Sequence, residues 1–145
     1  MIKNERQYRI TKAQIAKFQK GLEALEQSRP RDVHPVLQKA QREALESQLA
    51  DLLAEVGEYE ALQAGRQRAL QLRSLDDIPE ALIRARISKG LSQKQLAEKI
   101  GLKEQQIQRY EATDYATASF GRIRQVIRAL NLRTKKAVLL EAASK

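Results

Sequence analysis

The stretch GLSQKQLAEKIGL, residues 90–102, decides the fold of the C-terminal half of this chain. Ser92 is a favoured helix N-cap, and Gln95, three residues later, is the residue type that completes a capping box. Leu96 falls on the face of this helix that turns towards a core. Gly101 can adopt the positive φ of a tight turn. The pattern predicts a short helix that ends in a sharp turn before a second helix.

The second helix, at about 103–111, is predicted to have two chemically different faces. At about 100° per residue, Ile107 and Tyr110 share one side, while Gln105 and Arg109 point away from them. Such a helix can bury one face and offer the other to the major groove of DNA.

Polar side chains on the outer face of this helix are suited to reading base edges. Glutamine matches adenine N6 and N7, arginine matches guanine O6 and N7, and glutamate can accept from cytosine N4. The predicted base-reading residues are Glu104, Gln105, Gln106, Gln108 and Arg109.

About residues 79–132 resemble the Xre/Cro-like, phage-repressor type of helix-turn-helix regulator. The resemblance rests on GLSQ (90–93), LA (96–97), IG (100–101), Ile107, YE (110–111), SF (119–120) and ALNL (129–132). It implies that Gln93 contacts a phosphate and that Glu104, Gln105 and Arg109 occupy the groove-reading positions. Two departures affect the loops and the DNA sequence read: Lys103 replaces a common Ser or Thr, and Ala112-Thr113 stand where the family has a Gly.

Further polar and basic side chains around the motif are candidates for phosphate contacts, which fix position without reading sequence. The set is Ser92, Gln93, Lys94, Lys103, Tyr115, Arg122 and Arg124. The alternative is that some of these charges are only solvated and that Tyr115 has a packing role.

The net charge of +9 is concentrated in the C-terminal half. Residues 1–78 hold 13 basic and 12 acidic side chains, whereas residues 79–145 hold 14 basic and 6 acidic. Such asymmetry favours a polyanionic partner, nucleic acid being the commonest, although charge also serves solubility.

The composition argues against an enzyme. The chain has no Cys and one His, and it contains neither a Gly-rich phosphate loop nor a cluster of metal ligands. Glu98 and Glu111 are interpreted as helix-surface or helix-end charges. We therefore expect no cofactor, no metal and no catalytic residue.

The N-terminal half is predicted to form a helical hairpin. One helix is expected from Thr11 to about Gln27 and a second at about 36–63, ended by Gly65. Apolar residues at spacings of three and four give each helix one stripe. The predicted interaction face comprises Ile15, Phe18, Leu22, Leu45, Leu49, Leu52, Val56 and Tyr59. This seam can close within the hairpin or pair with another chain.

The expected fold class is all-α, in two units. Residues 1–73 would form the hairpin and a linker, and residues 74–145 a five-helix helix-turn-helix domain whose last helix spans about 134–143. No apolar run approaches the length of a membrane span, so we expect a cytoplasmic protein without a membrane partner.

The leading functional hypothesis is a repressor of its own operon that binds double-stranded operator DNA as a homodimer. The alternative is an antitoxin whose hairpin holds a partner protein, the cognate toxin, while the helix-turn-helix represses the shared operon. That alternative comes from the amphipathic, nearly neutral hairpin and from the family's frequent use in toxin–antitoxin pairs.

Overall fold

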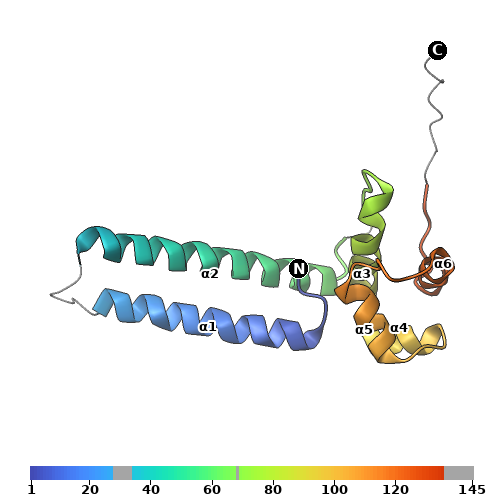
Figure 1. Ribbon diagram of the computed structural model, residues 1–145, viewed down its shortest axis with the longest axis horizontal. Coiled ribbons are helices and arrows are strands. Elements are labelled where there is room, and N and C mark those ends of the chain that lie inside the picture. The colour runs from blue at the N-terminus through green and yellow to red at the C-terminus, as the bar shows by residue number, and fades with distance from the viewer. Residues whose placement is uncertain (28–33, 68, 136–145) are drawn as a thin grey trace, which may run out of the picture.

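The computed structural model describes residues 1–27, 34–67 and 69–135, and within these ranges the chain is all-helical, as predicted. A long two-helix hairpin projects from a cluster of shorter helices (Figure 1). The elements are α1 (Glu5–Gln27), α2 (Pro35–Gln63), a 3-10 turn η1 (Leu75–Asp77), α3 (Ile78–Ser88), α4 (Gln93–Lys99), α5 (Glu104–Ala112) and α6 (Phe120–Ala129).

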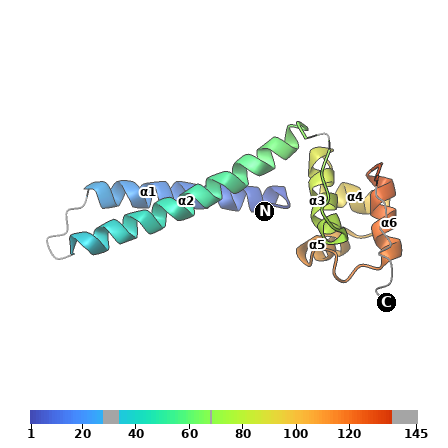
Figure 2. The same cartoon turned by 90° about the horizontal axis from the view of Figure 1, so that it is seen from above.

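The predicted apolar seam closes inside the hairpin, where α1 and α2 run antiparallel and cross (Figure 2). Near the helix cluster, Ile15, Val56 and Tyr59 are buried. Towards the connecting loop, the other five residues of the seam are only half-buried: Phe18, Leu22, Leu45, Leu49 and Leu52. The two helices therefore cover each other well at the base and less well at the tip.

The first helix starts at Glu5, six residues before the predicted start. The predicted start at Thr11 is wrong because Asn4 caps the helix instead. Its side-chain oxygen accepts from the Gln7 backbone N–H at 2.9 Å, and the Gln7 side chain accepts from the Lys3 N–H at 2.7 Å. Thr11 lies buried inside the helix, its hydroxyl donating to the Gln7 carbonyl.

The local signals of the helix-turn-helix are confirmed. The Ser92 hydroxyl accepts from the Gln95 N–H at 3.1 Å, and the Gln95 side chain accepts from the Ser92 N–H at 2.8 Å, which completes the capping box. Gly90 and Gly101 have φ values of +66° and +69°, a conformation that glycine adopts without strain. The turn at Gly90 sets the direction of α4 relative to α3, and the turn at Gly101 sets the direction of α5 relative to α4.

The core of the helical cluster is made by Leu96, Ile107, Val126 and Leu130, each no more than 1 % exposed. Phe120, by contrast, is 74 % exposed. It is the first residue of α6 and lies about 120° around the helix axis from Val126, so it falls outside the packed face.

The predicted fifth helix of the domain, at about 134–143, lies outside the described residues except for residues 134 and 135, which are not helical. None of the helices in the described ranges combines the length and apolar character needed to cross a bilayer. Within the same ranges, no three His, Asp or Glu side chains are grouped so that they could hold a metal.

Candidate nucleic-acid interface

The two faces of α5 are arranged as its sequence predicts. Ile107 is fully buried, while Glu104, Gln105, Gln108 and Arg109 are exposed. Because these four polar side chains occupy the first turn and the turn that follows, they form a continuous outer surface about two turns long. The arrangement exposes amide, carboxylate and guanidinium groups on the side from which the edges of bases could be met.

Three of the candidate base-reading residues already make side-chain hydrogen bonds. Gln106 is half-buried and its side-chain oxygen accepts from the Lys103 N–H at 3.1 Å, so it caps the start of α5. The Gln108 amide donates to the Glu104 carboxylate at 3.1 Å. Gln105 and Arg109 make no side-chain hydrogen bond to any of the described residues, so they are the side chains most available to a ligand.

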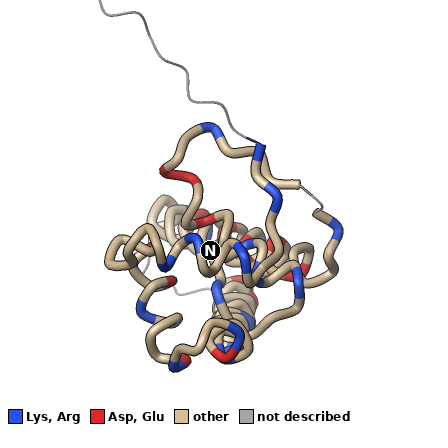
Figure 3. The backbone as a smooth tube through the Cα atoms, turned by 90° about the vertical axis from the view of Figure 1, so that its right-hand side faces the viewer, with Lys and Arg blue, Asp and Glu red and all other residues tan. Residues whose placement is uncertain are grey.

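The candidate phosphate-binding side chains fall into two groups. Lys94 and Lys103 are exposed cations at the starts of α4 and α5, and Arg124 is an exposed cation in the middle of α6. Ser92 and Arg122 are partly committed: Ser92 caps α4, and Arg122 donates to Gln125 at 2.6 Å. In the end-on view of Figure 3, basic positions are spread over the cluster of short helices rather than gathered at one point.

Gln93, the residue that the family resemblance assigns to a phosphate, is only 6 % exposed. Its amide donates to the Glu111 carboxylate at 2.7 Å, and its side-chain oxygen accepts from the Asn4 side chain at 3.3 Å. In this conformation both the NH₂ group and the oxygen of the Gln93 side chain are hydrogen-bonded within the protein. The segment before α1 thus covers part of the start of α4.

A buried ion pair lies beneath this contact, between Arg86 of α3 and Glu111 of α5. The guanidinium donates to both carboxylate oxygens, at 2.6 and 2.8 Å, and the side chains are 3 % and 0 % exposed. Two further bonds run from Arg86 to backbone carbonyls, at Leu91 (2.7 Å) and Lys3 (2.6 Å). Glu111 lies in the last turn of α5, as expected of a helix-end charge, but it is not a surface charge: its buried carboxylate joins α3, α4 and α5.

The same cluster fixes the N-terminal segment to the helix-turn-helix. The Lys3 ammonium donates to the Glu111 carbonyl and to the Asp114 carboxylate, the latter at 2.9 Å. Together with the bonds from Arg86 and Asn4, these contacts hold the start of α1 against α4 and α5. The hairpin is therefore attached to the helix-turn-helix at two places. Residues 3 and 4 attach the start of α1, and the linker connects the end of α2 to α3.

Tyr115 is buried, at 2 % exposure, and stacks on Tyr110 with 6.0 Å between ring centroids. Asp114 and Tyr115 have φ values of +47° and +58°, in the left-handed region that glycine adopts most readily. Burial, together with the nearby Glu111 carboxylate, raises the pKa of the Tyr115 hydroxyl. That hydroxyl has no hydrogen-bond partner among the described residues.

Tyr115→Phe is expected to leave the free energy of unfolding unchanged or raise it by about 1 kcal/mol, since an unpaired buried hydroxyl is costly. Tyr115→Ala should lower it by about 3–5 kcal/mol through loss of packing. Urea unfolding of the three proteins measures both effects. If Tyr115→Phe instead weakened DNA binding about tenfold at unchanged stability, Tyr115 would be a phosphate ligand.

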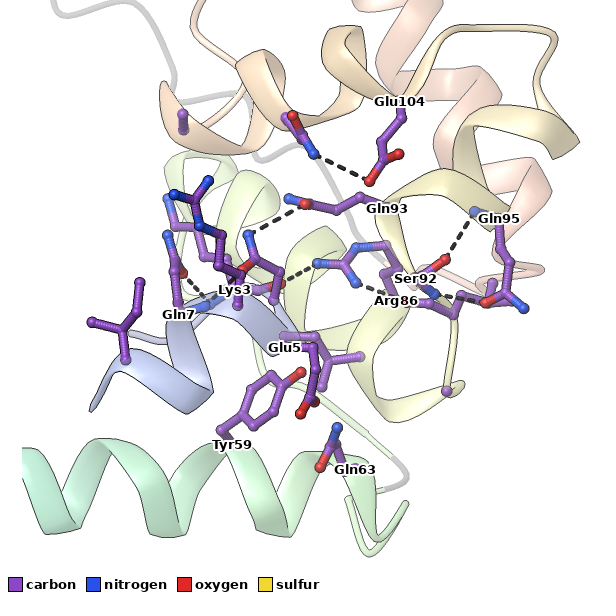
Figure 4. Close-up of a pocket in the computed structure, with 18 residues that line it drawn as sticks. Lys3, Glu5, Gln7, Tyr59, Gln63, Arg86, Ser92, Gln93, Gln95 and Glu104 are labelled. Atoms are coloured by element: carbon purple, nitrogen blue, oxygen red, sulfur yellow. Dashed lines mark hydrogen bonds between the residues drawn. The ribbon is translucent and has the colours of Figure 1, made fainter. Parts of the chain in front are cut away.

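A cleft of about 770 Å³ separates the start of α1 from the helix-turn-helix (Figure 4). One wall carries Lys3, Arg6 and Gln7, and the opposite wall includes Gln95 and Glu104. Because Glu104 also belongs to the outer surface of α5, the first turn of α1 stands directly beside the candidate base-reading helix.

Residues 82–136 match a family model described as helix-turn-helix. The match contains α4, α5, α6 and most of α3, and it leaves the hairpin outside. Comparisons with curated proteins and with solved structures gave no match.

Proposed function

Since residues 82–136 belong to the Xre/Cro-like helix-turn-helix family of DNA-binding regulators, we propose that the chain represses transcription by binding a specific operator as a homodimer. The observation that carries this proposal is the division of α5. Ile107 is fully buried, while Gln105 and Arg109 are exposed and unbonded.

In this proposal α5 lies in the major groove, which is wide enough for a helix and distinguishes all four base pairs. Arg109 would form a bidentate bond with a guanine and Gln105 with an adenine, while Glu104 would accept from a cytosine. Lys94 and Lys103 would hold the flanking phosphates and fix the position of α5 without selecting a sequence.

Dimerisation would place two copies of α5 on one face of the duplex. Their separation would be about 34 Å, one helical turn, so that the operator would be a palindrome of two half-sites. RNA polymerase would be excluded where such a site overlaps a promoter. Sedimentation of the free protein and a footprint on selected DNA would test the symmetry.

Arg109→Ala and Lys94→Ala are expected to weaken DNA binding in different ways. Loss of Arg109 should cost about 1–3 kcal/mol on the selected operator and relax the preference at one base pair, because a base contact is lost. Loss of Lys94 should weaken specific and random duplexes by the same factor. Binding isotherms on operator and random DNA measure the contrast.

Both substitutions affect exposed side chains, so circular dichroism should show unchanged folding for each. Gln48→Ala, on the exposed side of α2 and away from the interface, serves as a control expected to bind like the original chain. The assignment of roles would be overturned if Arg109→Ala lost the same fraction on operator and random DNA. A chain that selects no duplex at all would overturn the proposed function itself.

The second candidate function is an antitoxin, favoured by apolar side chains that the hairpin leaves in solvent. On α2, Val36, Leu37 and Leu53 are 68 %, 54 % and 47 % exposed. A toxin encoded beside this chain could cover them. Co-expression with the neighbouring reading frame, followed by purification of the complex, would support this function, and independent purification of the two products would oppose it.

A further inference from the structure

The two helices of the hairpin carry opposite charge. Between Glu5 and Gln27, α1 has five basic and three acidic residues, whereas between Pro35 and Gln63, α2 has two basic and six acidic. The near-neutral total of residues 1–78 therefore conceals a basic helix and an acidic one. Only one of the two can attract a polyanion.

The acidic residues at the base of α2 are occupied by contacts within the chain. Glu55 pairs with the amino group of Met1 at 3.4 Å, and Glu58 pairs with Arg84. Glu60 accepts from the Tyr8 hydroxyl at 2.6 Å and lies 3.9 Å from the Lys12 ammonium. These carboxylates bind the hairpin together and hold it to α3.

Four basic residues on α1 are, by contrast, exposed and without an ion-pair or hydrogen-bond partner among the described residues: Arg6, Arg9, Lys17 and Lys20. At about 100° per residue they fall within an arc of about 80°, on the side of α1 opposite Ile15 and therefore facing away from α2. We call these four residues the basic stripe. It extends about 21 Å along the helix, from Arg6 to Lys20.

The basic stripe begins at the candidate interface. Arg6 lines the cleft whose other wall includes Gln95, Glu104 and Gln108. In Figure 1, α1 is the hairpin helix on the same side as α4 and α5, while α2 and α3 lie on the other side. A duplex bound to α5 and continuing past the cleft would run along the basic stripe.

On the basis of the proposed function, we infer that the basic stripe is a second DNA-contacting surface, which binds the sugar–phosphate backbone of the duplex flanking the operator. Arginine and lysine on a helix face provide the charge that backbone contacts require, without base selectivity. A length of about 21 Å corresponds to about six base pairs. Arg6 and Arg9 would touch DNA next to the half-site, and Lys17 and Lys20 would touch it farther out.

The contacts of the N-terminal segment give this surface a fixed position. Bonds from Arg86 to the Lys3 carbonyl (2.6 Å) and from Asn4 to Gln93 (3.3 Å) attach the start of α1 to the same helices that present α5. A rigidly placed cation contributes more binding free energy than one on a mobile segment, because less ordering entropy is lost. Asn4 thus covers Gln93, and α1, which follows Asn4 directly, supplies Arg6 and Arg9 as the phosphate-binding side chains at this position.

The test compares three double variants of the full chain on two duplexes. Arg6→Gln/Arg9→Gln removes the near half of the basic stripe and Lys17→Gln/Lys20→Gln removes the far half. Arg66→Gln/Arg73→Gln, in the segment before η1, changes the net charge equally and serves as the control. One duplex contains only the selected operator, and the other extends it by about ten base pairs on each side, more than the reach of about six.

The near variant is expected to bind the extended duplex at least about tenfold more weakly at about 100 mM salt, with a salt slope lower by about 2 per chain, and to bind the operator-only duplex like the original chain. The far variant should lose affinity only on the extended duplex. The control should match the original chain on both. Footprints should shorten correspondingly on the flanks.

Several results would overturn the inference. Near and far variants that bind like the control would show that the basic stripe is only solvated. Tighter binding by the near variant would show that the start of α1 obstructs DNA. Either of these results would show that the basic stripe is not part of the interface. The proposed function would still stand, provided that the original chain selects an operator and that Arg109→Ala relaxes its specificity.

Discussion

Replacing Glu111 with alanine is expected to lower the free energy of unfolding by about 3–5 kcal/mol, because it leaves a buried guanidinium without its counter-charge. Arg86 is 3 % exposed at its side chain and would keep only the carbonyls of Lys3 and Leu91. Gln93 would also lose its acceptor at 2.7 Å. Urea unfolding followed by circular dichroism measures the loss.

A double variant, Arg86→Met/Glu111→Leu, separates the loss of the pair from the creation of an unpaired charge. Buried ion pairs can often be replaced by apolar side chains at little cost, so the double variant should be more stable than Glu111→Ala. The interpretation fails if Glu111→Ala costs less than about 1 kcal/mol, or if the double variant is the less stable of the two.

The affinity for operator DNA is expected to fall steeply with salt. Four candidate cations per chain, Lys94, Lys103, Arg122 and Arg124, give eight in a dimer. If all neutralise a phosphate, affinity should drop by about 10⁴-fold between about 50 and 200 mM salt, and by about 10²-fold if half do. Isotherms on the operator-only duplex at several salt concentrations provide the slope.

The slope is compared with that of a variant in which both chains of the dimer carry Lys94→Gln and Lys103→Gln. Its slope should be shallower by about 4, which corresponds to the four cations removed. Binding that is indifferent to salt would contradict backbone contacts by these side chains. If the salt slope of the Lys94→Gln/Lys103→Gln variant equals that of the original chain, the phosphate contacts are made elsewhere on the chain.

The parts of the fold that follow from neighbouring residues could be predicted from the sequence. The capping box of Ser92 and Gln95 depends on residues three apart, and the two faces of α5 depend only on helical periodicity. The hairpin seam likewise follows from apolar spacing. These features need no knowledge of what lies far away in the sequence.

The contacts that join distant segments could not be predicted in this way. Arg86 and Glu111 are 25 positions apart, and Arg86 and Lys3 are 83 apart. A signal was nevertheless present, because Arg86 lies among Leu82, Ile83 and Ile87 on the buried side of its helix, and Glu111 lies four residues after Ile107. A charge at a core position on each of two helices is typical of a buried pair.

The charge segregation of the hairpin was missed for a different reason. Over residues 1–78, the net +2 of α1 and the basic residues outside the two helices offset the net −4 of α2, so the total charge of this half does not show the segregation. Summing by helix and by face would have revealed the basic stripe. The early start of α1 was missed because Thr11 is also a good cap, and only the segment docked on α4 favours Asn4.

The uneven burial of the hairpin seam has a thermodynamic consequence. Local opening of a protein begins where few apolar contacts hold the backbone, and the half-buried pairs near the loop fulfil that condition. Ile15, Val56 and Tyr59 resist it at the other end. The ends of α1 and α2 that are farthest from α3 should therefore open more often than the ends near α3. The helix-turn-helix helices α3, α4 and α5 should keep their positions when this happens.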